Sequence, residues 1–184
     1  MFTIPDFFDA AARTQILAEL RTAAASDATV YGVAKSVDAQ VRRTKHVKAS
    51  EATRALVLRK LEACKAEIER HFDVQTDIIE DPQFLRYEAG DFFVAHQDGN
   101  TPLVRDDTRF RKVSLVIFLS DRGEYDGGEL QLHGKYPDFD RRESAPAEPG
   151  TLVAFRAETT HEVTPLTRGE RYTIVAWYRV RPSD

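Results

Sequence analysis

The sequence predicts a mainly β protein, a sandwich or barrel, supported by helices at its N-terminal end. Three observations lead to this fold class. A length of 184 residues suits one domain with a sizeable core. Helical periodicity is confined to residues before 75. From residue 76 onward, short β-rich runs alternate with turn signals such as Gly127-Gly128 and Pro149-Gly150. We therefore expect a single domain, with residues 1–75 as a helical support region and 76–184 as a β-rich core.

Two helices are expected in the support region. The first covers residues 9–25, begins at the N-cap Asp9, and has an apolar side. The second begins at the N-cap Ser50, and its apolar residues recur at spacings of three and four, which predicts a face packed on a sheet. Residues 26–49 are mixed, with short strands conceivable at 31–33 and 39–41. The apolar positions of the two helices are Ile16, Leu17 and Leu20, then Val57, Leu61, Cys64, Ile68 and Phe72.

Seven strands are expected in the core region, and the run at 113–119 is apolar enough to be central. Two long connections separate some of them, and loops of that length tend to be functional or disordered. We expect the first, Asn100 to Arg111, to border the mouth of a site because it follows the His-Asp pair described below. The second runs from Gly134 to Pro149. The expected strands cover residues 83–88, 92–98, 112–119, 128–133, 151–155, 160–164 and 171–180.

Composition narrows the possible partners and the compartment. Hydrophobic residues make up 42% and charged residues 30%, as in globular proteins, and the formal net charge is -4. Since no basic block is present, we expect no nucleic-acid partner. A single cysteine, Cys64, excludes an intrachain disulfide and favours a reducing compartment. No signal peptide and no membrane-length apolar run is present, so a cytoplasmic protein is expected. The oligomeric state is not indicated.

A pair of potential metal ligands stands near the end of the second expected core strand. His96 and Asp98 are two residues apart, and side chains at i and i+2 of a strand leave the same face. His161, which follows the expected strand at 151–155, is the natural third ligand. Two histidines and one carboxylate form the facial triad that suits non-haem Fe(II). Taken alone, a His-x-Asp pair is more often an ordinary surface feature, and His46, His71 and His133 are expected at the surface.

Arg171 opens the last expected strand and shares one face with Thr173, Val175 and Trp177. A guanidinium can hold a carboxylate through two parallel charge-assisted hydrogen bonds. An Arg171 pointing into the barrel would therefore suit a dicarboxylate, whereas the simpler alternative is a solvent-exposed arginine. Arg168 lies in an expected turn and should point outward.

Together these residues resemble the Fe(II)/2-oxoglutarate-dependent oxygenases, and more narrowly the prolyl 4-hydroxylase-like group. The resemblance covers residues 83 to 178 and keeps the order of the group's motifs, whose joint occurrence is specific. One departure is Phe93, which stands where many members carry a tyrosine. The matching motifs are Tyr87-Glu88-Ala89-Gly90, His96-x-Asp98, Gly127-Gly128-Glu129, Pro149-Gly150-Thr151, His161-Glu162-Val163-Thr164-Pro165 and Gly169-Glu170-Arg171.

The resemblance implies a double-stranded β-helix, which is a jelly-roll, cupin-like barrel. It implies that His96, Asp98 and His161 hold Fe(II), and that Arg171 holds the far carboxylate of 2-oxoglutarate. O₂ is the second cosubstrate, and ascorbate is allowed as an accessory cofactor. Tyr87 or Thr173 would take over the role of the hydroxyl that Phe93 lacks.

The reaction implied is hydroxylation of a C–H bond with release of succinate and CO₂. We expect a prolyl or other residue of a peptide or protein as substrate, with Arg42-Arg43-Thr44-Lys45 as a rim and an otherwise apolar interior around Phe93 and Trp177. The alternatives are a hydroxylase of a free amino acid or small metabolite, a cupin-like metal isomerase or other non-oxygenase, and a binding module with a degenerate site.

Overall fold

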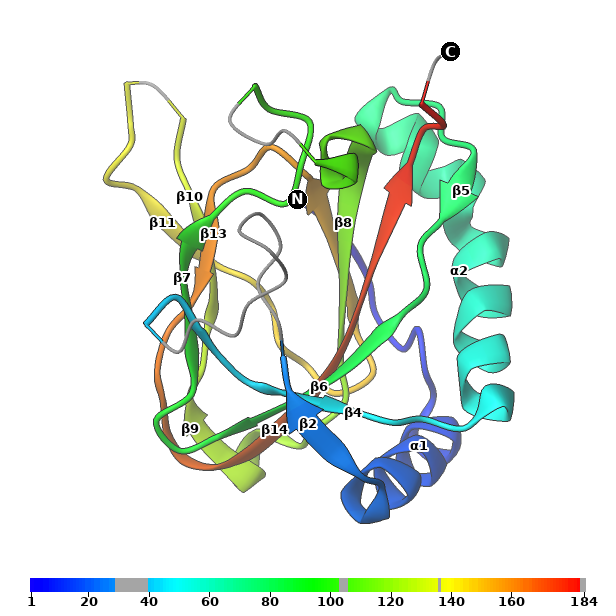
Figure 1. The fold of residues 1–184 in the computed structure, drawn as a ribbon, viewed down its shortest axis with the longest axis vertical. Coiled ribbons are helices and arrows are strands. Elements are labelled where there is room, and N and C mark those ends of the chain that lie inside the picture. The colour runs from blue at the N-terminus through cyan, green and yellow to red at the C-terminus, as the bar shows by residue number, and fades with distance from the viewer. Residues whose placement is uncertain (29–39, 103–105, 136, 183–184) are drawn as a thin grey trace.

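The computed structural model describes residues 1–28, 40–102, 106–135 and 137–182, and it confirms the mainly β fold. Two antiparallel sheets face each other, and helices α1 (Ala10–Thr22) and α2 (Glu51–Phe72) pack on the outer side of the larger sheet (Figure 1). This is the predicted double-stranded β-helix, or jelly roll. Within the described residues, no helix is both long enough and apolar enough to cross a membrane.

The larger sheet is organised around its longest strand, β14 (Leu166–Arg179), which pairs with four other strands along its length. The order is β1-β12-β8-β14-β6-β4-β2, and β5 and β9 also pair with β14. The bounds are β1 Phe2–Ile4, β2 Ala25–Asp27, β4 Lys45–Val47, β5 Ile78–Ile79, β6 Gln83–Glu88, β8 Arg111–Phe118, β9 Tyr125–Gly127 and β12 Leu152–Arg156.

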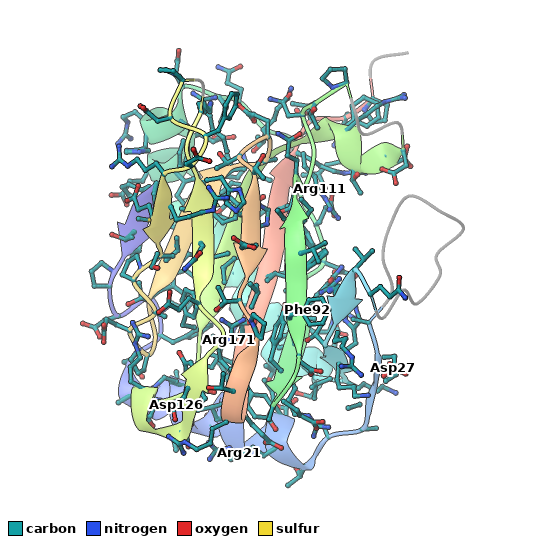
Figure 2. The ribbon with its side chains drawn as sticks, turned by 90° about the vertical axis from the view of Figure 1, so that its left-hand side faces the viewer. Arg21, Asp27, Phe92, Arg111, Asp126 and Arg171 are labelled. Carbon is teal, nitrogen blue, oxygen red and sulfur yellow. The ribbon has the colours of Figure 1, made fainter. Side chains whose placement is uncertain are left out.

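The smaller sheet faces the viewer in Figure 2 and has the order β11-β10-β13-β7-β3. Two short 3-10 helices, η1 and η2, stand before β8 and β9. The bounds are β3 Arg42–Arg43, β7 Phe92–His96, β10 Leu130–His133, β11 Arg142–Ser144, β13 His161–Val163, η1 Asp107–Phe110 and η2 Arg122–Glu124.

The sequence signals for both helices are confirmed. The Asp9 carboxylate accepts from the Ala12 N–H at 2.8 Å, and the Ser50 hydroxyl accepts from the Thr53 N–H at 3.2 Å, so both predicted N-caps satisfy backbone donors. The predicted stripe of α2 is buried against the sheet, except that Cys64 is half-buried. α1 ends three residues early because residues 25–27 pair with β4 instead.

The side chains of β14 divide the interior into two parts. Tyr172, Ile174, Ala176 and Tyr178 face the helices and belong to the core between the helices and the larger sheet. The alternate residues Arg171, Thr173, Val175 and Trp177 line the space between the two sheets. The predicted common face of these four residues is therefore confirmed, and it points inward.

Several expectations of local structure are wrong. β7 ends at His96 rather than at residue 98, and the expected turn at 167–170 lies inside β14. The possible strand at 31–33 lies outside the described residues, whereas residues 40–41 form a turn and the strand starts at Arg42. β1 to β5, β9 and β11 were not predicted, since strands of two or three residues carry no periodicity and form by pairing with a neighbour. β11 also interrupts the expected loop at 134–149.

The helix–sheet core should dominate stability. Leu61 is fully buried on α2, so Leu61→Ala should lower the free energy of unfolding by about 2–5 kcal/mol through lost burial and a residual cavity. Urea unfolding followed by circular dichroism measures this loss. The neighbouring exposed Glu62 gives the control, since Glu62→Ala should change the value by no more than about 0.5 kcal/mol. Equal effects of the two substitutions would contradict the assignment of Leu61 to the core.

Candidate metal centre

His96 and His161 lie directly opposite each other on the paired strands β7 and β13. The next paired positions are Val163 and Phe93, so two steps along β13 correspond to three along β7. Such a bulge adds one residue to a strand and turns its side chains. As a result Phe93 and His96, although three residues apart, both face the interior, where their rings stack with centroids 3.6 Å apart.

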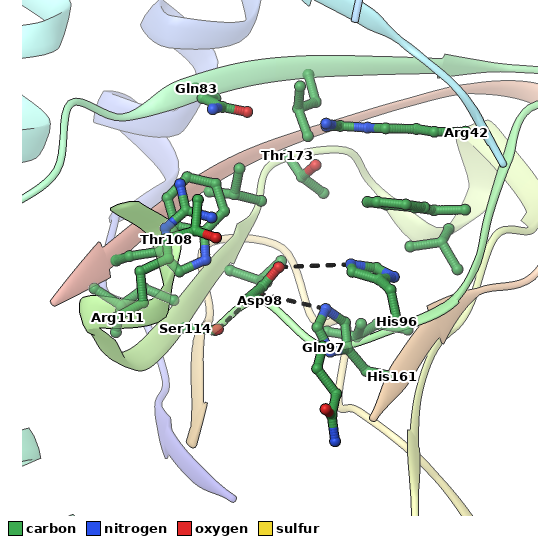
Figure 3. Close-up of a pocket in the computed structure, with 18 of the residues that line it drawn as sticks. Arg42, Gln83, His96, Gln97, Asp98, Thr108, Arg111, Ser114, His161 and Thr173 are labelled. Atoms are coloured by element: carbon green, nitrogen blue, oxygen red, sulfur yellow. Dashed lines mark hydrogen bonds and ion pairs between the residues drawn. The ribbon is translucent and has the colours of Figure 1, made fainter. Parts of the chain in front are cut away.

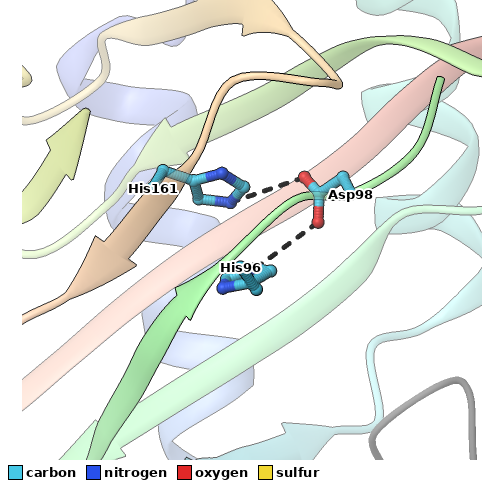
Figure 4. Close-up of side chains that lie close together, drawn as sticks. All are labelled: His96, Asp98 and His161. Carbon is cyan, nitrogen blue, oxygen red and sulfur yellow. Dashed lines mark ion pairs between the residues drawn. The ribbon is translucent and has the colours of Figure 1, made fainter. Parts of the chain in front are cut away.

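Asp98 lies close to both histidines, but strand alternation, which was the predicted reason, does not place it there. It lies beyond the end of β7, and its backbone N–H donates to the Ala157 carbonyl at 2.9 Å, so a loop contact rather than strand alternation places it. Asp98 Oδ1 is 3.5 Å from His96 Nε2, and Asp98 Oδ2 is 3.6 Å from His161 Nε2 (Figure 4). One ligand atom from each of the three residues lies within 4.8 Å of the others.

The far side of each imidazole is held by a backbone carbonyl. His96 Nδ1 lies 2.8 Å from the Val94 oxygen, and His161 Nδ1 lies 2.9 Å from the Thr159 oxygen. A carbonyl only accepts, so each Nδ1 carries the proton and each Nε2 presents a lone pair toward Asp98. Three acceptors then converge without a donor between them, an arrangement that a cation satisfies. The two histidines and one carboxylate fit Fe(II).

Burial and mutual contact set the charges that a metal requires. Burial lowers the pKa of His161 to about 4, so its imidazole is neutral at neutral pH. Burial opposes ionisation of Asp98, but the pKa of that carboxyl still lies well below its usual range, and the hydrogen bond from the Ser114 hydroxyl contributes to this lowering. Metal ligands bind in their deprotonated forms, and both residues are already in those forms.

The triad forms one wall of a cavity of about 410 Å³ between the sheets. Figure 3 shows Arg111 and Thr108 on one side of Asp98, and Arg42 and His96 on the other. The described part of the 100–111 segment borders this cavity as predicted, through Asp106, Thr108 and Arg111.

Arg171 faces the same cavity and is only 3% exposed, so the alternative of a solvent-exposed arginine is wrong. Its Nη1 donates to the Gly128 carbonyl, and its guanidinium carbon lies 4.5 Å from the centre of the Tyr87 ring. Its Nε is buried without a hydrogen-bond partner, and among the described residues no carboxylate pairs with it. Burial lowers the pKa of Arg171 because it disfavours the charged guanidinium. An anion that binds beside this buried guanidinium would stabilise its charge.

Tyr87, Thr173 and Arg168 take the positions expected for them, whereas His133, expected at the surface, has only 11% of its side chain exposed. Tyr87 and Thr173 are buried and line the cavity beside Arg171. Arg168 points outward, where its side chain is 59% exposed and pairs with Asp126 at 2.6 Å. Gly128, whose carbonyl holds Arg171, has a φ of +63°, and a Cβ there would meet Leu166 at 2.5 Å.

The interior is more polar than the sequence analysis predicted. Arg42 is not a rim residue, since it is buried with its guanidinium 4.9 Å over the Phe93 ring, while Lys45 pairs with Asp27. Gln83 and Ser114 also line the cavity and were missed. Ser114 could have been noticed in the sequence, because it is the one hydroxyl residue within the apolar run at 113–119. The inward position of Arg42 could not have been predicted in this way, because the direction of its side chain depends on the pairing of β3 with β7.

A family model described as the 2OG-Fe(II) oxygenase superfamily matches residues 82–179. PKHD-type hydroxylases from Cupriavidus pinatubonensis and Burkholderia lata are 37% and 42% identical to this chain over 103 and 105 residues. The alignments cover 55% and 56% of this chain but 43% and 44% of those relatives, so the chain spans less than half of their length.

Two solved structures share the fold. A prolyl-4-hydroxylase from Pseudomonas putida superposes with a TM-score of 0.74 at 23% identity, covering 98% of this chain and 92% of the other. A prolyl hydroxylase from Trichoplax adhaerens, solved with a peptide fragment of the hypoxia inducible factor oxygen degradation domain, gives a TM-score of 0.72 at 18% identity, with coverages of 97% and 82%. At these identities the likeness establishes the fold, in agreement with the predicted jelly roll.

Metal binding tests the convergence of the triad. His161→Ala should abolish measurable binding of Co(II), used as an air-stable probe, because it removes one of three ligands. His133→Ala is the matched control, since His133 lies outside the cavity and pairs with Glu162 at 3.0 Å. Titration with Co(II), followed by visible absorption, measures the metal affinity of both variants. Wild-type affinity in His161→Ala would show that the triad does not hold the metal.

Proposed function

This chain belongs to the 2OG-Fe(II) oxygenase superfamily, and we propose that it is a dioxygenase that uses Fe(II), 2-oxoglutarate and O₂ to hydroxylate a C–H bond. The observation that carries the proposal is one cavity that contains both the His-Asp-His triad and a buried arginine without a carboxylate partner among the described residues. A metal-binding protein without oxygenase activity would need only the first of these features.

His96, Asp98 and His161 would hold the Fe(II), since they supply two imidazole nitrogens and one carboxylate. When bound, the iron with its cosubstrates supplies the oxidation that hydroxylates the substrate and converts 2-oxoglutarate to succinate and CO₂. The protein contributes ligand geometry. The carbonyls of Val94 and Thr159 fix both imidazole rings, as outer partners of metal-binding histidines commonly do.

Arg171 would bind the carboxylate of 2-oxoglutarate that lies away from the metal. Its contacts with the Gly128 carbonyl and the Tyr87 ring hold the guanidinium before the ligand arrives, so little side-chain freedom is lost on binding. Tyr87 and Thr173 place hydroxyls beside this site, and they are the candidates for the role that Phe93 cannot fill. Leu85, Phe118 and Val175 line the same cavity with apolar surface and exclude water.

The substrate we propose is a prolyl or other residue within a peptide or protein. Support comes from the Pseudomonas prolyl-4-hydroxylase and from the Trichoplax prolyl hydroxylase, which was solved with a peptide fragment. Free amino acids and small metabolites are the second candidate. Arg42 favours them, because a guanidinium inside a cavity of about 410 Å³ suits a small acid.

The reaction can be tested directly. Incubation of the protein with Fe(II), 2-oxoglutarate and a lysate should release succinate and add the mass of one oxygen atom to a residue of a protein. Free proline and other amino acids are assayed in parallel. Succinate formed in proportion to a free amino acid, with no modified protein, would favour the second candidate. Absence of succinate in every arm would overturn the oxygenase proposal.

Cosubstrate affinity tests the role of Arg171. Arg171→Ala should weaken 2-oxoglutarate binding by about 30-fold or more, because losing one partner of a buried charge pair costs roughly 2–5 kcal/mol. Arg168→Ala removes the same type of side chain from the exposed part of β14 and should have little effect. Binding to the metal-loaded protein can be measured calorimetrically without O₂. A loss in Arg168→Ala but not in Arg171→Ala would reassign the role.

A further inference from the structure

Ser114 is neither a proposed metal ligand nor part of the proposed cosubstrate site, yet it contacts Asp98 directly. It lies in β8 at 1% exposure, and its hydroxyl is 2.6 Å from Asp98 Oδ2 (Figure 3). An ionised carboxylate only accepts hydrogen bonds, so the hydroxyl donates. Hydrogen bonds to ionised acceptors are short and roughly twice as strong as neutral ones, and this length is typical of them.

Asp98 needs such a partner more than the two histidines do. Each imidazole is fixed by a backbone carbonyl on its Nδ1. The backbone of Asp98 is anchored through Ala157, but that contact leaves the carboxylate free to turn, and the final torsion of an aspartate is broad. From outside the triad, the Ser114 side chain donates a hydrogen bond to this carboxylate.

We propose that Ser114 is the positioning residue for Asp98, and that its hydrogen bond engages Oδ2 and leaves Oδ1 for the metal. The inference rests on the proposed metal site. The hydroxyl fixes the rotation of the carboxylate and opposes binding of the ion through both oxygens. A carboxylate that supplies a single oxygen leaves more of the coordination sphere for the cosubstrates.

The expected effect follows from measured outer partners of metal ligands, whose loss typically weakens metal binding by about 10- to 100-fold. Ser114→Ala should therefore weaken Co(II) binding by about that factor. Ser114→Thr keeps the hydroxyl and suits a strand, so it should recover most of the affinity.

Ser120 provides a matched control. It is also 1% exposed, and its hydroxyl accepts from the Tyr172 N–H at 2.8 Å, outside the metal centre. Ser120→Ala makes the same chemical change in a buried serine without touching a ligand. Dissociation constants for Co(II) alone are measured by visible absorption for the wild type and all three variants, with the melting temperature of each metal-free protein as a measure of folding.

A loss of affinity in Ser114→Ala, with retention in Ser120→Ala and recovery in Ser114→Thr, supports the proposal. Wild-type affinity in Ser114→Ala overturns it while leaving the metal site standing, and so does an equal loss in Ser120→Ala. If the wild-type protein itself fails to bind Co(II), the metal site is refuted and the role of Ser114 with it.

Discussion

The pairing of β14 with its neighbours is the constraint on which both halves of this protein depend. One face of the strand carries Tyr172, Ile174, Ala176 and Tyr178 into the core beneath the helices, and the other carries Arg171, Thr173, Val175 and Trp177 into the cavity. Side chains alternate along a strand, so a slip of one residue would exchange the two sets. The apolar core therefore fixes the direction of Arg171 as well as the fold.

The cavity concentrates charged groups that the fold alone does not neutralise. Arg171 is buried against Tyr87 and a carbonyl, and the Asp98 carboxylate lies beside two imidazole nitrogens and accepts a hydrogen bond from the Ser114 hydroxyl. Burying such groups is unfavourable unless a partner compensates them. A metal ion and a dicarboxylate would each supply a missing partner, and ligands that bind the folded state stabilise it. The same buried groups that are unfavourable without ligands would thus give the cavity affinity for a metal ion and a dicarboxylate.

Local irregularities place the ligands within reach of one another. The bulge in β7 turns both Phe93 and His96 inward, and the contacts of Asp98 and Gly99 with the Ala157 carbonyl bend the chain back toward the larger sheet. Gly99 also lets this segment lie against η1, because a Cβ there would meet the Thr108 carbonyl oxygen at 2.1 Å. The triad is therefore a product of backbone departures from regular strand geometry.

The sequence by itself determined the helices, the central strands, the identity of the three converging residues, and the common face of Arg171, Thr173, Val175 and Trp177. Each of these follows from information that is local in the chain: capping residues, helical or alternating periodicity, and motif order. Only the tertiary structure decided the short strands, the inward turn of Arg42, the contact of Ser114 with Asp98, and the loop that carries Asp98. These depend on pairings between residues far apart in sequence, such as Arg42 with Phe93 and Asp98 with Ala157. Local sequence patterns do not identify such pairing partners, because the free energy that favours each pairing arises only when the two sheets pack together.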